Sequence, residues 1–192
     1  MKQYYTWVII VLLVLFNLMF ILYSSAKEHI TFSVITFSDA VTKSGGKYLA
    51  KYIHKKLSEN YSDHTFLFDK NSTYDNLPEA INNAKSEGAE VIIGGVITKF
   101  KIGSNTVSIG FDCDVRFTSD GAIIFENSYS SSKPITKNWT WKGWEKLNIE
   151  SPSFEKTPLG KALNEAIENL MFDIDEHKNK IIKVIQKNRE SN

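Results

Sequence analysis

Residues 112–116 bring two carboxylates, a thiol and a guanidinium into one short segment. In an extended chain successive side chains point to opposite faces, so Asp112, Asp114 and Arg116 share one face and Cys113 lies on the other. Paired carboxylates can bind a metal ion or transfer protons, but an adjacent arginine can also neutralise one of them. We interpret this row as a solvated strand face with ion pairs. Cys113 follows the apolar positions of the segment, so we expect it in the core, without the exposed and electropositive setting of a reactive thiol.

A second candidate for chemistry is the glycine-containing segment at residues 44–47 (SGGK). A phosphate-binding loop requires a glycine five residues before its second glycine and a hydroxyl residue after the lysine. Val41 and Tyr48 occupy these positions, which indicates a loop that enters a helix. The histidines are scattered without the spacing of a metal site (His29, His54, His64 and His177). We therefore expect no catalytic residue, metal site or cofactor, and a protein that is not an enzyme.

Three tryptophans form the most unusual motif of the chain, Trp139-Thr-Trp141-Lys-Gly-Trp144. Tryptophan is enriched in binding hot spots because it buries a large area with few rotatable bonds. Three interpretations are open: a loop folded back over the sheet, a loop that binds a partner, or a contact with a membrane surface. We take Trp139, Trp141 and Trp144 as the candidate interaction loop.

The first 26 residues differ in composition from the rest of the chain, because residues 3–26 carry no charge. The run at residues 4–23 (YYTWVIIVLLVLFNLMFILY) is long enough to cross the roughly 30 Å hydrocarbon layer as a helix, with aromatic residues at both ends. Lys2 before it predicts a cytoplasmic N-terminus and a single-pass anchor. The alternative is a signal peptide cleaved after Ala26, since small residues occupy positions 24 to 26.

The remaining residues have the composition of a folded domain with balanced charge. The whole chain has 23 basic and 22 acidic residues, a formal net charge of +1, which argues against a nucleic-acid partner. One cysteine excludes an internal disulfide and a lipid anchor near residue 26. We divide the chain into the anchor at residues 1–26, an extracytoplasmic domain at residues 27–176 and a basic amphipathic helical tail at residues 177–192.

Hydrophobic periodicity predicts an α/β (α+β) fold with a mixed sheet, in the order β-α-β-α-β-β-β-α, after one transmembrane helix. Strands are expected at residues 29–38, 65–68, 89–102, 107–118 and 122–130, the last two joined by a turn at residues 119–121. Helices are expected at residues 48–60, from Pro78 to about residue 87, and from Pro158 onward, with Thr157 as N-cap. We expect residues 71–76 and 131–156 to be irregular. Gly94 and Gly95 suggest a bulge or a close approach of a neighbouring element.

Three of these segments resemble bacterial cell-envelope lipoproteins. They are residues 88–100 (GAEVIIGGVITKF), the hairpin at residues 112–125 and residues 157–167 (TPLGKALNEAI). The resemblance covers roughly residues 30–176. Within this range the chain is similar to the periplasmic domain of the curli-secretion lipoprotein and to YajG-type lipoproteins. It implies a non-enzymatic envelope domain that assembles with itself or with other envelope proteins. The lipidated cysteine of these proteins is absent here, and the turn at residues 103–105 is too short for a membrane-spanning hairpin.

Together these features predict a membrane-anchored periplasmic domain that acts by protein–protein interaction in the cell envelope. The membrane would be contacted through residues 4–23, and the partner would be another envelope protein or a second copy of the chain. The alternative is a periplasmic module, released by cleavage, that binds a small ligand or a peptide with its tryptophan loop.

Overall fold

The computed structural model describes residues 12–16, 29–42, 44–136 and 139–191. Most of the predicted membrane segment at residues 4–23, and residues 24–28, lie outside these ranges. The domain elements follow in the order β1 (Thr31–Thr36), α2 (Gly45–Asn60), β2 (Thr65–Thr73), η1 (Tyr74–Asn76), α3 (Leu77–Ser86), β3 (Val91–Ile102), β4 (Thr106–Phe117), β5 (Ile123–Pro134), η2 (Trp144–Lys146), α4 (Pro152–Glu155) and α5 (Pro158–Ser191). The predicted order and the mixed α+β class are confirmed.

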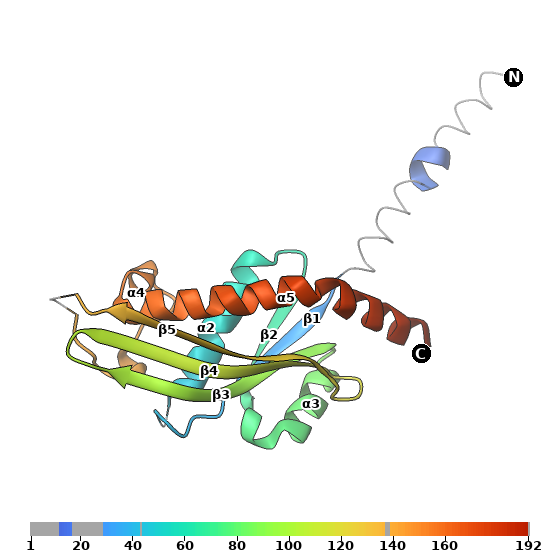
Figure 1. The fold of residues 1–192 in the computed structure, drawn as a ribbon. Coiled ribbons are helices and arrows are strands. Elements are labelled where there is room, and N and C mark those ends of the chain that lie inside the picture. The colour runs from blue at the N-terminus through green and yellow to red at the C-terminus, as the bar shows by residue number, and fades with distance from the viewer. Residues whose placement is uncertain (1–11, 17–28, 43, 137–138, 192) are drawn as a thin grey trace, which may run out of the picture.

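The five strands form one sheet in the order β2-β1-β3-β4-β5 (Figure 1). β1 pairs in parallel with β2 and β3, as two successive β-α-β units require. β3, β4 and β5 pair antiparallel, and Gly121 takes a positive φ of 73° in the turn that joins the last two. The predicted mixed sheet and the predicted hairpin of β4 and β5 are therefore confirmed, while the antiparallel pairing already begins between β3 and β4.

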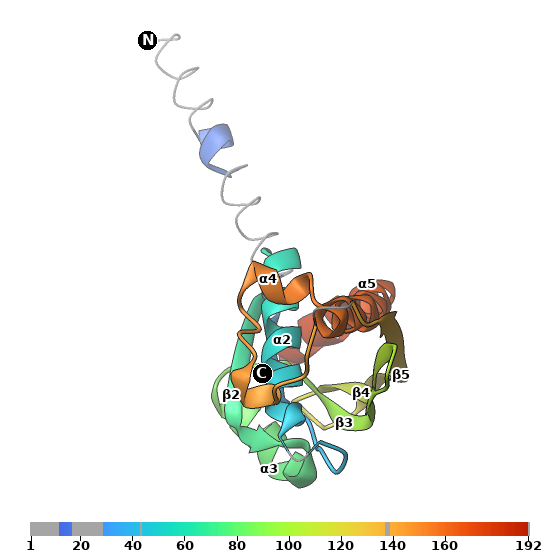
Figure 2. The same ribbon diagram turned by 90° about the vertical axis from the view of Figure 1, so that its left-hand side faces the viewer.

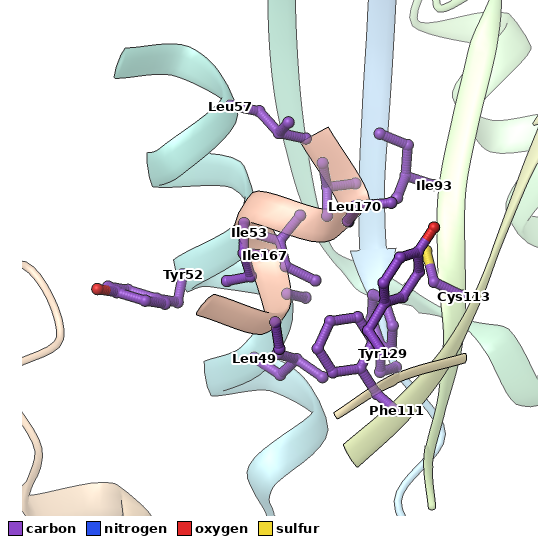
Figure 3. Close-up of a cluster of buried hydrophobic side chains, with 14 of the residues drawn as sticks. Leu49, Tyr52, Ile53, Leu57, Ile93, Phe111, Cys113, Tyr129, Ile167 and Leu170 are labelled. Atoms are coloured by element: carbon purple, nitrogen blue, oxygen red, sulfur yellow. The ribbon is translucent and has the colours of Figure 1, made fainter. Parts of the chain in front are cut away.

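Helices cover both faces of the sheet. α2 and α5 lie on one face and α3 lies on the other, as the end-on view shows (Figure 2). The larger core lies under α2 and α5 and contains Leu49, Tyr52, Ile53, Leu57, Ile93, Phe111, Cys113, Tyr129, Ile167 and Leu170 (Figure 3). The smaller core packs Ile35 and Ile92 against α3. β1 contributes to both cores, which explains its apolar residues on both faces.

Two strands extend further than their sequence pattern predicts. β2 continues to Thr73, because Thr73 pairs with Thr36 of β1. A shift in register precedes this pair, and there the Asp69 carboxylate accepts hydrogen bonds from the backbone N–H groups of Asn71 and Ser72. β5 continues to Pro134, which pairs with Thr106. Both extensions are polar in sequence and depend on the neighbouring strand for their hydrogen bonds. The prediction of irregular structure was therefore wrong at residues 71–73 and 131–134, and also at residues 152–155, which form α4.

α5 is a single helix of 34 residues that runs along the sheet. Thr157 Oγ1 accepts a hydrogen bond from the backbone N–H of Gly160, which confirms its predicted role as N-cap. The helix continues through residues 177–191, where Ile181 and Ile185 are buried against the core. The predicted basic tail is thus the last four turns of α5.

A short helical segment at residues 12–16 is the described part of the apolar N-terminal run. Its five apolar side chains are each 51–69% exposed. Within the described ranges, no helix combines the length and the hydropathy that crossing a membrane requires.

Candidate functional site

The tryptophan loop connects β5 to α4 and turns sharply at Gly143. Gly143 has φ 99°, a value that favours glycine, and η2 follows it immediately. This turn directs Trp144 into the domain, where it is 3% exposed. Trp139 and Trp141 are only partly buried and pack against the larger core from outside. Lys137 and Asn138 lie outside the described residues.

The three indole rings join two further aromatic residues in what we call the tryptophan cluster: Tyr48, Phe100, Trp139, Trp141 and Trp144. The Phe100 ring lies 5.1 Å from the Trp141 ring and 5.0 Å from the Trp144 ring. Trp141 meets Trp144 edge-on at 5.4 Å, and Tyr48 stacks on Trp144 at 6.2 Å. Ring pairs at these separations stabilise each other beyond the area they bury. The loop is thus folded back onto β3 and α2, while Trp139 and Trp141 still present partly exposed edges.

Two properties of Trp144 show how tightly the base of this cluster is packed. A Cβ atom on Gly45, the first residue of α2, would lie 2.8 Å from the Trp144 ring, so glycine is required there. The indole Nε1 of Trp144 is buried and has no hydrogen-bond partner among the described residues. Such an unpaired donor destabilises a fold by about 1–3 kcal/mol, which the packing of this large ring must offset.

The tryptophan cluster lies at the end of the domain opposite to the point where the described domain begins. β1 starts near His29 and runs toward Phe37, and α2 starts at Gly45, beside that far end. Trp144 packs on Gly45 at the start of α2, beside the end of β1, and the first residue of β1 lies at the other end of that strand. Figure 1 shows the length of β1 between these two ends of the domain. A chain tethered through its N-terminus therefore holds the cluster away from the tether.

The row of charged residues on β4 is not a solvated face, contrary to the sequence-based interpretation. Asp114 is 2% exposed, because η1 and α3 cover this part of the sheet. Its Oδ2 accepts hydrogen bonds from the Tyr74 hydroxyl at 2.6 Å and from Arg116 Nε at 2.9 Å. Burial and then the bond to Asp114 raise the pKa of Tyr74 to about 12.

The predicted ion pair between Asp114 and Arg116 is present, with Oδ2 and Nη2 2.5 Å apart. Asp112 lies outside this cluster and accepts a hydrogen bond from Ser128. The arrangement holds η1, which leads directly into α3, against the sheet. The described residues contain no group of three or more side chains able to hold a metal ion.

The other two chemical candidates have structural roles. Cys113 is fully buried, and burial raises the pKa of its thiol well above the ordinary value. The segment at residues 44–47 leads into the N-terminus of α2, where the carboxylate of Asp39 already takes the place that a bound phosphate would need. The Asp39 carboxylate accepts hydrogen bonds from the backbone N–H groups of Thr42 and Gly46. Burial alone would raise the pKa of Asp39, but these bonds and the one from the Thr42 hydroxyl outweigh it and lower the pKa.

Comparison with known proteins gives fold similarity at low sequence identity. The hypothetical protein CT253 from Chlamydia trachomatis matches with a TM-score of 0.54 and 11% identity, over 79% of this chain and 98% of that one. The PelC dodecamer from Paraburkholderia phytofirmans matches with a TM-score of 0.45 and 13% identity, over 64% and 77% of the two chains. Lipoprotein GNA1162 from Neisseria meningitidis matches with a TM-score of 0.39 and 9% identity, over 59% and 87%.

The likeness to CT253 concerns the fold alone, and TM-scores as low as the other two do not establish a common fold. No protein-family model and no curated protein matches the sequence. The resemblance to curli-secretion and YajG-type lipoproteins therefore stays a prediction.

The sequence pattern identified the three tryptophans, but it did not identify their partners Tyr48 and Phe100. These two residues lie on α2 and β3, roughly 40 to 90 positions earlier in the chain, and their own periodicity only marks them as apolar. Tyr74 was missed in the same way, because its segment was expected to be a loop. The sequence offered one signal for Tyr74: Asp114 is a charged residue in a largely apolar strand, and a buried carboxylate needs a hydrogen-bond donor from another element.

Proposed function

We propose that this protein is a membrane-anchored, extracytoplasmic domain that acts by protein–protein contact in the cell envelope, without catalysing a reaction. The observation that carries the anchor is the helical segment at residues 12–16, whose five consecutive apolar side chains are all more than half exposed. Exposed apolar surface of this kind is unfavourable in water and favourable in a lipid phase. The uncharged residues on both sides of this segment extend the same property over residues 3–26.

The contact surface of this proposal is the outer edge of the tryptophan cluster. Trp144 fixes the loop in the core, while Trp139 and Trp141 remain partly exposed. Rigid aromatic side chains with exposed edges lose little conformational freedom on binding. Because the cluster lies at the far end of β1 from His29, an anchored domain would present it to a partner in the envelope and away from its own membrane.

Extraction of membranes with alkaline carbonate, together with N-terminal sequencing, tests the anchor. We expect the chain to stay in the membrane fraction with residues 1–26 intact. A protein that is released by carbonate and begins at Lys27 would contradict the anchor. That result would favour the alternative of a cleaved periplasmic module that binds a small ligand or a peptide.

Site-specific photocrosslinking in intact cells tests the contact surface. A crosslinker in place of Thr140, which is exposed between two tryptophans, is compared with one in place of Asp120, which is exposed in the turn between β4 and β5. Figure 1 shows this turn at the opposite end of the sheet. We expect a discrete adduct from position 140 only. Equal adducts from both positions, or none from position 140, would contradict the proposal.

Alanine variants separate binding from folding. Trp139→Ala and Trp141→Ala should weaken capture of the crosslinked partner with little loss of stability, since both rings are partly exposed. Trp144→Ala serves as the folding control and should destabilise the domain by about 3–5 kcal/mol, the usual range for a buried aromatic residue. If Trp139→Ala and Trp141→Ala lower stability but leave capture unchanged, the cluster is structural only.

A further inference from the structure

α5 is divided into an acidic and a basic half. Residues 158–176 contain one basic residue, Lys161, and five acidic residues: Glu165, Glu168, Asp173, Asp175 and Glu176. Residues 177–191 contain one acidic residue, Glu190, and five basic residues: Lys178, Lys180, Lys183, Lys187 and Arg189. The formal charge thus changes from −4 to +4 along a single helix of about 50 Å.

The helix macrodipole does not account for this separation. Acidic residues near the start of a helix and basic residues near its end are favoured, but the effect is confined to the first and last turns. Lys178, Lys180 and Lys183 lie two to four turns before the end of α5, where the dipole contributes little. The helix dipole therefore does not explain the basic half, and we look for the reason in its position in the fold.

The basic end of α5 lies against the first residues of the domain. Arg189 Nη2 donates a hydrogen bond of 2.6 Å to the backbone carbonyl of His29, and Arg189 also pairs with Glu90 at 2.7 Å. Figure 1 shows the C-terminal end of α5 and the start of β1 at the same end of the sheet. The last four turns of α5 are thus fixed at the end of the domain that is closest in sequence to the apolar segment.

The length of the intervening chain limits how far this end can be from the membrane. Only five residues separate Tyr23, the last aromatic residue of the apolar run, from His29. At no more than about 3.6 Å per residue, Tyr23 and His29 cannot be more than roughly 20 Å apart. An anchored chain would therefore hold the basic end of α5 beside the headgroups of the leaflet through which it emerges.

Nearby acidic residues neutralise only some of the cations in the basic half of α5. Asp63 pairs with Lys178 at 3.2 Å, and Glu90 pairs with Arg189. Lys183 and Lys187 are exposed, and within the described chain no hydrogen bond or ion pair of their ammonium groups is present. Lys85 on α3 adds a further cation beside a hollow of about 230 Å³ that Arg189 and Ser119 also line.

We propose that the basic half of α5 rests on anionic phospholipid at the membrane surface, with Lys183 and Lys187 in contact with the headgroups. This inference rests on the proposed anchor, which confines the domain to that surface. Each lysine near an anionic surface contributes about 1 kcal/mol, roughly a fivefold change in the equilibrium between docked and undocked domain. Docking would fix the orientation of the domain and hold the tryptophan cluster outward.

The test uses the full chain in nanodiscs of phosphatidylcholine, with or without phosphatidylglycerol, and an acceptor dye on the headgroups. A donor dye is attached at Asn179→Cys on α5 or, as the reference, at Ser104→Cys in the β3–β4 turn at the opposite end. Cys113 is fully buried and does not compete for the label. We expect energy transfer from position 179 to increase with phosphatidylglycerol, and transfer from position 104 to remain low.

Charge variants complete the design. Replacing both Lys183 and Lys187 by Gln should lower the docking equilibrium about 25-fold and return transfer to its level in phosphatidylcholine. The matched control replaces Lys99 and Lys101, two exposed lysines near the far end of β3, and should have no effect. Transfer that is the same in both lipids, or that falls equally in the control, would overturn the inference while leaving the anchor intact. A chain that fails to enter either nanodisc would instead contradict the anchor itself.

Discussion

The Tyr74 hydroxyl donates a hydrogen bond of 2.6 Å to the carboxylate of Asp114, across 40 residues of sequence. The bond connects the η1 turn to β4, at a position where the carboxylate is 2% exposed. Arg116 supplies the opposite charge from the same strand. A carboxylate that the sequence places on an alternating polar face is thus buried, and it holds the η1 turn against the sheet.

We expect Asp114→Asn to destabilise the domain by about 2 kcal/mol, because hydrogen bonds to a buried charged group typically contribute about 1.5–3 kcal/mol. Asp112→Asn, two residues earlier on the same face, should cost less than about 1 kcal/mol, since Asp112 is partly exposed and its carboxylate accepts a hydrogen bond from Ser128. Urea denaturation followed by circular dichroism measures both. Equal losses for the two variants would show that the Asp114 cluster has no special role.

Alkaline pH should unfold the domain through its tyrosines. Burial raises the pKa of Tyr74 from 10.0 to about 12, and it also raises the pKa values of Tyr52, Tyr61 and Tyr129. A tyrosine in the unfolded chain loses its proton near pH 10, whereas the folded protein retains it to higher pH. The contribution of these tyrosines to stability is therefore constant below about pH 10 and falls as the pH rises toward 12.

Tyrosinate absorbance and circular dichroism, recorded together during a pH titration, check this expectation. The buried tyrosines should ionise in the same step as the loss of tertiary structure. Ionisation of all tyrosines near pH 10, with the fold intact, would contradict the burial of these hydroxyls. Tyr74→Phe removes one of the groups and should make the alkaline loss of stability less steep.

Gly95 should not tolerate a side chain. A Cβ atom at this position would overlap the backbone carbonyl of Asp112 on β4, which cannot move without breaking the strand pairing. We expect Gly95→Ala to destabilise the domain by about 1–3 kcal/mol, as overpacking of a core does. At Gly103 a Cβ would meet only ordinary contacts, at 3.5 Å or more, so Gly103→Ala is the matched control. A neutral Gly95→Ala would show that the two strands are less closely packed than described.

Cys113 should be unreactive in the folded protein. Its side chain is fully buried, and its thiol pKa is well above the ordinary value. We expect a thiol reagent such as Ellman's reagent to label the protein only after unfolding in urea, at a rate that follows the unfolded fraction. Rapid labelling under native conditions would show that β4 is exposed or that this end of the core opens readily.

The two glycines of β3 show what a sequence pattern can and cannot decide. Their position in an apolar strand indicated either a bulge or a close approach of another element. The structure shows close approach, by Ile35 and Tyr74 at Gly94 and by the Asp112 backbone at Gly95. The register shift in β3 occurs later, between Ile97 and Lys99. The choice between a bulge and a close approach depends on the side chains and backbone that lie next to the glycines, and these belong to residues distant in the sequence.

The sequence by itself determined the order of the elements, the strand and helix periodicities, the Thr157 cap, the burial of Cys113 and the apolar character of residues 4–23. These properties depend on residues that are neighbours in the chain, so local propensity and hydrophobic spacing are sufficient to predict them. Only the tertiary structure decided that Asp114 is buried, that Tyr48 and Phe100 complete the tryptophan cluster, and that the basic end of α5 lies beside His29. Each of these contacts joins residues separated by 40 or more positions, and the packing of the whole sheet brings them together.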